Sequence, residues 1–318
     1  MCFTKEAQNS AVFCCTSDMG YLFLGMALLC GAAKGYCGKK TSGYIRSFDD
    51  SVTVSLFRMA CCVLIGLCLV PAEGGGTAFS LPVLCIGMAS GAATTIFVLS
   101  WILSVRTGSY MMVDIFLTSG VILPVLACHF LYGEKLTLRH GIGFVLLLVA
   151  VFVMCGYNNK IKGRLTLPAV LLLTVCGLSN GTADLMQKVY LHHADGVSVS
   201  VFNLYTYLTS AVLLLLLFFI LRGKSRRAAA APAEESGALS LRKIWPYILV
   251  MSACLFFYSF LTTRAAGYLP SVVLYPISQA GGMMLTAVMA AMFFGEKITK
   301  RSALGMALAL SALLLMNL

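Results

Sequence analysis

Residues 130–137 of this chain read Phe-Leu-Tyr-Gly-Glu-Lys-Leu-Thr, and residues 293–299 read Phe-Phe-Gly-Glu-Lys-Ile-Thr. Each copy ends a long apolar run, and each is followed by basic residues, a glycine and a final apolar run. A tandem repeat in a very hydrophobic chain is typical of transporters built from two similar halves around one central pathway.

The composition indicates a membrane protein. Hydrophobic residues make up 59% of the 318 residues and charged residues only 11%, whereas about 25% of a soluble domain is charged. Spanning a bilayer as a helix takes about 20 apolar residues, and lipid offers no partners to an open strand edge. The sequence therefore predicts an all-α membrane protein with ten transmembrane helices. The predicted spans are 19–37, 52–70, 80–103, 111–131, 141–157, 165–190, 197–221, 245–263, 270–294 and 303–318.

The repeat extends beyond the Gly-Glu-Lys motif. Residues 50–58 match residues 195–203 at most positions, and residues 31–34 align with residues 181–184. Each half then holds five spans, and because five is odd, the second copy lies upside down relative to the first. We expect two inverted five-helix repeats. The predicted organisation is a tail over 1–18, repeats over 19–157 and 165–318, and a flexible loop over 222–244.

This organisation resembles the drug/metabolite transporter superfamily, in its ten-helix EamA-type branch. The two Gly-Glu-Lys motifs carry the resemblance, together with Gly120 and Pro124 before the first motif and Pro276 and Gly281 before the second. It covers nearly the whole chain. It implies export or exchange of small organic solutes through a central cavity, without naming the solute. The same prolines and glycines are expected to break the helices that contain them.

The net charge of +11 does not indicate a nucleic-acid partner, because Lys and Arg fall in short loops between apolar runs. There they anchor and orient helices against anionic headgroups. Most lie in loops on one side, which by the positive-inside rule places both termini outside the cell. The resemblance instead implies termini inside. The expected location is the bacterial plasma membrane, and the oligomeric state stays open.

Ionisable residues inside membrane spans are the first candidates for a site, because each costs roughly 2.5–3.5 kcal/mol on insertion scales. Lys34 and Asp184 occupy matched positions in the two repeats. We expect them to pair in, or line, the central pathway. The alternative is that Lys34 reaches a membrane interface and Asp184 pairs with Lys188 one turn further on.

Asn180, Asp184 and Gln187 share one face of the sixth span. Such a polar stripe either lines a cavity or joins helices, and we favour the cavity. Gly177 and Gly181 nearby permit close approach of a solute or of another backbone.

Arg58 is matched by Asn203. A guanidinium here could hold an anionic group bidentately, or it could anchor the helix at the interface.

Asp114 is matched by Tyr275, and Gln279 lies one turn further along the ninth span. Asp114 could bind a cation or carry a coupling proton, or it could pair with Arg106. These matched pairs and Gln279 complete the predicted substrate site.

Glu134 and Glu296 recur within the repeated motif, but each lies at a helix break, where a carboxylate favours the N-terminus of the following helix. Aromatic residues such as Trp101 and Tyr258 are expected mainly in packing or at the interface, although any of them could stack on a solute.

No catalytic or nucleotide-binding motif is present in the sequence, so an enzyme is not expected and no cofactor or metal is predicted. We expect a secondary active transporter, an exporter or exchanger of small polar metabolites such as amino acids, working by alternating access, with a proton as a possible coupling ion. The alternatives are an efflux pump for organic cations or drugs and, in a different class, a membrane enzyme or a non-transporting interaction protein.

Overall fold

The computed structural model describes residues 3–73, 80–107, 110–161, 166–194, 196–228, 241–296 and 299–317. Over these residues the chain forms eleven α-helices and no β-strand. The helices are α1 (Phe3–Ser42), α2 (Phe48–Ala72), α3 (Leu81–Thr107), α4 (Tyr110–Ser119), α5 (Ile122–Tyr132), α6 (Leu138–Ile161), α7 (Leu167–His192), α8 (Val199–Ala228), α9 (Leu241–Ala266), α10 (Ser271–Phe294) and α11 (Lys300–Asn317).

Eight segments are long and apolar enough to cross a membrane, counting Tyr110–Tyr132 as one, and Leu138–Val153 is a shorter apolar helix. The prediction of an all-helical, multi-pass membrane protein is confirmed at this level. Helix α1 continues back to Phe3, through most of the predicted tail. Helices α8 and α9 extend into both ends of the predicted loop, whose residues 229–240 lie outside the described part of the chain.

The predicted fourth span is interrupted, and its sequence explains why. Pro124 has no N–H to donate to the carbonyl of Gly120, and its ring would clash with that carbonyl in a continuous helix. The chain makes tighter bonds there instead, from Gly120 N to Leu117 O at 2.9 Å and from Leu123 N to Gly120 O at 3.2 Å. The break expected at Pro276 is wrong, because α10 continues through it.

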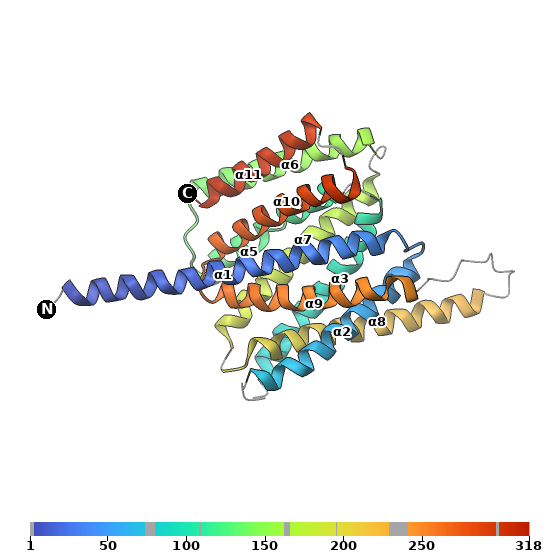
Figure 1. Ribbon diagram of the computed structural model, residues 1–318, viewed down its shortest axis with the longest axis horizontal. Coiled ribbons are helices and arrows are strands. Elements are labelled where there is room, and N and C mark those ends of the chain that lie inside the picture. The colour runs from blue at the N-terminus through green and yellow to red at the C-terminus, as the bar shows by residue number, and fades with distance from the viewer. Residues whose placement is uncertain are drawn as a thin grey trace.

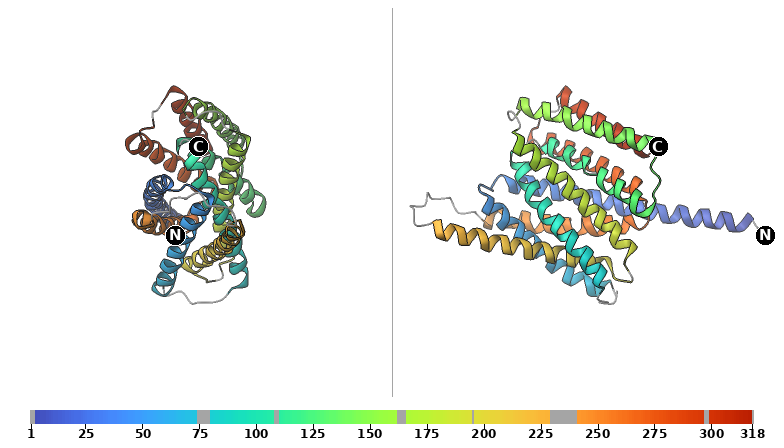
Figure 2. Two further views of the ribbon diagram at one scale, coloured as in Figure 1. Left: turned by 90° about the vertical axis from the view of Figure 1, so that its right-hand side faces the viewer. Right: turned by 180° about the vertical axis from the view of Figure 1, so that it is seen from behind.

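The helices lie roughly side by side, as Figure 1 shows, with α6 and α11 at one edge and α2 and α8 at the other. Between these edges α1 packs along α9, and α3 packs along α7. The view from the end in Figure 2 shows α1 and α9 as neighbours. Both chain termini lie at the same end of the bundle. Helices from the two halves of the sequence are therefore interleaved throughout.

Two glycines close the helices that carry the repeated motif. Gly133 follows α5 and Gly295 follows α10, with φ of 67° and 62°, in the left-handed region. An L side chain in that region costs roughly 1–2 kcal/mol. We therefore expect Gly133→Ala and Gly295→Ala each to lower the free energy of unfolding by about 1 kcal/mol. Thermal unfolding in detergent measures this. Gly141→Ala is the control, since it lies in helix α6 with open space around its Cα, and an equal loss there would contradict the argument.

The broken helix packs directly on the backbone of α7. A Cβ added to Gly120 would lie 2.2 Å from the carbonyl oxygen of Gly177, and one added to Gly181 would lie 2.3 Å from the carbonyl oxygen of Gly120. Small residues let membrane helices approach this closely. Of the two possibilities for Gly177 and Gly181, the structure thus shows approach of another backbone.

Candidate functional site

A cavity lies between the two halves of the chain. Helices α1 to α4 line it from the first half, and α7, α9 and α10 line it from the second. Five of the nine predicted site residues line this cavity, namely Lys34, Arg58, Asp114, Asn180 and Gln279.

Lys34 lies on α1 with its ammonium against aromatic rings. Its Nζ is 4.3 Å from the ring centroid of Tyr258 and 6.0 Å from that of Phe97. It is close enough to Asp114 and Asp184 to attract both carboxylates. Within the described part of the chain, however, neither of them forms an ion pair with it. The predicted direct pairing of Lys34 with Asp184 is therefore not formed in this conformation.

Arg58 lies on α2 and is only 1% exposed. Its Nη1 atom contacts the sulfur of Met251 at 3.7 Å, and its Nε has no hydrogen-bond partner. A thioether is a weak acceptor, so a buried positive charge faces the cavity without an anionic neighbour among the described ion pairs. The side chain lies inside the bundle, not at its outer surface.

Asp114 lies on α4 and lines the cavity together with Thr286 of α10. Its Oδ2 atom is buried without a partner. Arg106, the alternative partner considered from the sequence, is exposed at the end of α3, and the described ion pairs do not include it. The free carboxylate oxygen is thus available to a group inside the cavity.

The polar stripe of α7 is only partly in the cavity. Asn180 lines it and donates from Nδ2 to Oδ2 of Asp184 at 3.5 Å. Asp184 and Gln187 are each 5% exposed and lie outside the cavity lining. Lys188 does not pair with Asp184, because its ammonium donates to the carbonyl oxygens of Ala266, the last residue of α9, and of Leu269 just after it.

Asn203 and Tyr275, the remaining predicted site residues, lie outside the cavity lining. Asn203 is fully buried on α8 and accepts a hydrogen bond from Ser259 of α9 at 2.9 Å. Tyr275 of α10 donates to the backbone oxygen of Asp184 at 2.6 Å. In this conformation both residues join neighbouring helices.

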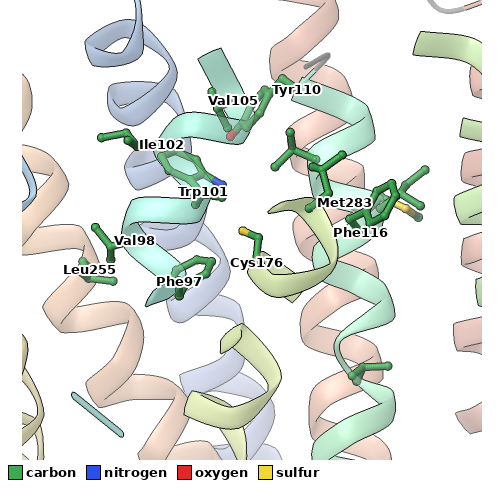
Figure 3. Close-up of a cluster of buried hydrophobic side chains, with 14 of the residues drawn as sticks. Phe97, Val98, Trp101, Ile102, Val105, Tyr110, Phe116, Cys176, Leu255 and Met283 are labelled. Carbon is green, nitrogen blue, oxygen red and sulfur yellow. The ribbon is translucent and has the colours of Figure 1, made fainter. Parts of the chain in front are cut away.

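Aromatic residues form much of the wall, whereas the sequence favoured packing or interface positions for Trp101 and Tyr258. Phe97, Trp101, Tyr110 and Tyr258 all line the cavity. In Figure 3, Phe97 and Trp101 lie one turn apart on α3, and Val98 on the same helix lies beside Leu255 of α9. An aromatic residue inside an apolar run looks the same whether it packs, faces lipid or lines a pocket. The spacing of four residues between Phe97 and Trp101 was the available signal.

The motif glutamates cap helices of the opposite half. Glu134 accepts from the amide and the hydroxyl of Ser271, at the start of α10. Glu296 accepts from the amides of Tyr110 and Met111, at the start of α4, at 2.8 and 3.3 Å. The prediction that each carboxylate favours a helix N-terminus is confirmed, but the helix is not the following one.

A lysine lies near each of the two motif glutamates. Lys39, at the end of α1, donates to the carbonyl of Val105 at 3.0 Å and lies 4.0 Å from Glu296. Lys188, at the end of α7, binds carbonyls at the end of α9 and attracts the Glu134 carboxylate. Each end of the bundle therefore holds one lysine and one glutamate that connect the two halves.

Outside the cavity, Glu73 follows α2 and forms an ion pair with Arg264 of α9. It also accepts from the Ser200 amide at 3.0 Å. Burial acts to raise the pKa of the Glu73 carboxyl, but the bonds from Ser200 and Arg264 outweigh it and lower that pKa. This pair fastens helix ends and adds nothing to the cavity.

No protein family matches the chain, and no curated protein matches it either. The structure is similar to a protein whose crystal structure has been solved, with a TM-score of 0.63 and 13% sequence identity, over 93% of this chain and 95% of that one. At this identity the likeness shows the fold alone. It extends over almost the full length of both chains, so the helical arrangement is not peculiar to this sequence.

Proposed function

We propose that this chain is a secondary active transporter of the EamA type, moving small polar organic metabolites such as amino acids across a bacterial plasma membrane. The observation that carries the proposal is the cavity between the halves, which places Lys34, Arg58 and Asp114 inside an apolar helical bundle. Charged residues buried in a membrane-spanning bundle mark solute and ion pathways in general.

The packing supports an architecture of ten membrane-spanning helices in two inverted repeats. Exchanging the halves maps α1 on α7 and α3 on α9, so the contact of α1 with α9 becomes the contact of α7 with α3. The end of α5 meets the start of α10, and the end of α10 meets the start of α4. Matched segments thus run in opposite directions, as inversion requires.

The charges favour an amphoteric or anionic solute over an organic cation. Two basic side chains and one acidic side chain line the cavity, namely Lys34, Arg58 and Asp114. Efflux of organic cations remains the second candidate, because the aromatic wall provides surfaces on which cations stack. Asp114, in the cavity, and Asp184, beside it, are the proposed carriers of a coupling proton.

Transport by purified protein in liposomes tests the proposal. With a broad panel of labelled metabolites, we expect uptake of at least one solute, and we expect Lys34→Ala and Asp184→Asn to reduce that uptake at least about tenfold, the effect of losing roughly 1.4 kcal/mol of transition-state stabilisation. Arg106→Ala is the control, because Arg106 is exposed and outside the cavity. If no member of the panel moves, transport is the wrong function. If Lys34→Ala and Asp184→Asn both transport normally, their assignment to the pathway is wrong.

A further inference from the structure

Unpartnered charged atoms of both signs face the same cavity. The Arg58 guanidinium has five N–H donors, and its hydrogen bonds within the described residues amount to one contact with a sulfur atom. Burying a charge without a partner is strongly unfavourable. A side chain that is 99% buried and still unpaired is therefore expected to gain a partner in another state of the protein. Because Arg58 faces a cavity, we take this partner to be a ligand.

Lys34 lines the same cavity as the two other charged residues, Arg58 and Asp114. One side of its ammonium rests over the Tyr258 ring. It interacts electrostatically with Arg58 and with Asp114. The positive charges of Lys34 and Arg58 repel each other. A carboxylate bound by both side chains would offset this repulsion. The Arg58 fork suits two carboxylate oxygens, and the ammonium adds a third donor direction.

Asp114 on α4 supplies the opposite charge, and its Oδ2 atom is unpartnered. A plain anion bound at Arg58 and Lys34 would leave that oxygen unsatisfied. A plain cation bound at Asp114 would meet two positive side chains. A solute that carries both charges satisfies all three groups, and the walls formed by Leu28, Leu117, Phe97 and Trp101 offer apolar surface to its remainder.

We propose that this cavity selects zwitterionic solutes, with the solute carboxylate held by Arg58 and Lys34 and its ammonium group held by Asp114. This inference rests on the proposed transport function and specifies the charge class of the solute. It also assigns opposite tasks to different helices: α1 and α2 bind the anionic end, and α4 binds the cationic end. The apolar part of the solute lies against the aromatic residues of α3.

The first test uses the full-length protein in detergent and three probes that share one scaffold. Leucine carries both charges, leucinamide carries only the positive one, and N-acetyl-leucine carries only the negative one. A ligand raises the melting temperature by mass action. We expect leucine to raise it more than either singly charged analogue at equal concentration. If leucinamide or N-acetyl-leucine stabilises the protein as well as leucine does, or if leucine has no effect, the proposal is overturned.

The second test uses Arg58→Gln and Lys34→Gln, with Arg106→Gln as the matched control on the exposed surface. We expect the affinity for leucine to fall at least about tenfold in the first two variants, because each loses charged hydrogen bonds. The ligand-free melting temperature should not fall in Arg58→Gln, because an unpaired buried charge has been removed. A merely structural arginine would give the reverse pattern, a lower melting temperature and an unchanged leucine response. Arg58→Lys keeps the charge without the fork and should bind leucine with intermediate affinity.

Liposome transport separates this inference from the function beneath it. If the protein transports organic cations or neutral solutes but no zwitterion, the charge assignment is wrong and the transporter stands. If the protein neither transports nor binds any solute of the panel, both proposals fail. Transport of leucine that is lost in Arg58→Gln and kept in Arg106→Gln supports both.

Discussion

Replacing Gly177 by alanine is expected to destabilise the protein strongly. The new Cβ would lie 2.5 Å from the carbonyl oxygen of Phe116. That obstacle is backbone, so no rotamer change relieves the clash, and α4 and α7 must separate. Overpacking of this kind typically costs about 1–3 kcal/mol and occasionally more. We expect about 3 kcal/mol here, because the displaced helix also carries Asp114.

The measurement is thermal unfolding of the purified protein, where this loss corresponds to a fall of roughly 5–10 °C. Gly25→Ala is the matched control. It changes the same residue type in α1, and its Cβ would meet nothing within 4 Å. Alanine is a better helix former than glycine by up to about 1 kcal/mol, so this control should be neutral or slightly stabilising. Equal melting temperatures for the two variants would show that α7 does not depend on backbone contact with α4.

Glu134→Ala and Glu296→Ala form the second prediction, with an expected loss of about 2 kcal/mol each. Either change removes a carboxylate that accepts two hydrogen bonds at the start of a helix in the other half. Hydrogen bonds to charged groups contribute about 1.5–3 kcal/mol, and a carboxylate also interacts favourably with the helix N-terminus. Thermal or denaturant unfolding measures the loss.

Glutamine is the graded control at both positions. Its amide oxygen still accepts one bond but carries no charge, so Glu134→Gln and Glu296→Gln should lose about half as much stability. The two glutamates lie at different ends of the bundle and share no partner among the described hydrogen bonds and ion pairs, and the double variant should therefore be additive. A fully stable Glu296→Ala protein would show that this cap contributes nothing.

Much of the helical structure could be predicted from the sequence, and the reason is simple. Each apolar run must satisfy its own backbone in lipid, so its length alone predicts a helix. The interruption near Pro124 follows from a missing N–H, which is local information. Pro276 has the same chemistry, yet α10 continues through it, so a proline by itself does not decide between a kink and a break.

The cavity was predicted less well than the helices. The repeat indicates how far along its helix a residue lies, but it does not indicate toward which side of the helix the side chain points. Lys34 and Asp184 have matched positions, yet Lys34 lines the cavity and Asp184 lies behind Asn180. One residue along a helix turns a side chain by about 100°, so a small difference in packing is enough to move it out of the lining. The partners of the motif glutamates were also out of reach, because they lie 137 and 186 residues away in the sequence.

That long separation has a consequence for how the protein is made. The amides at the start of α4 obtain their partner from Glu296, 186 residues further along the chain. At a synthesis rate of about 5–20 residues per second, roughly 10–40 s pass between the two. During this interval the amides at the start of α4 lack the carboxylate that accepts from them in the folded protein. A segment made late therefore completes one made earlier, and a chain truncated before Glu296 would leave the beginning of α4 without this cap.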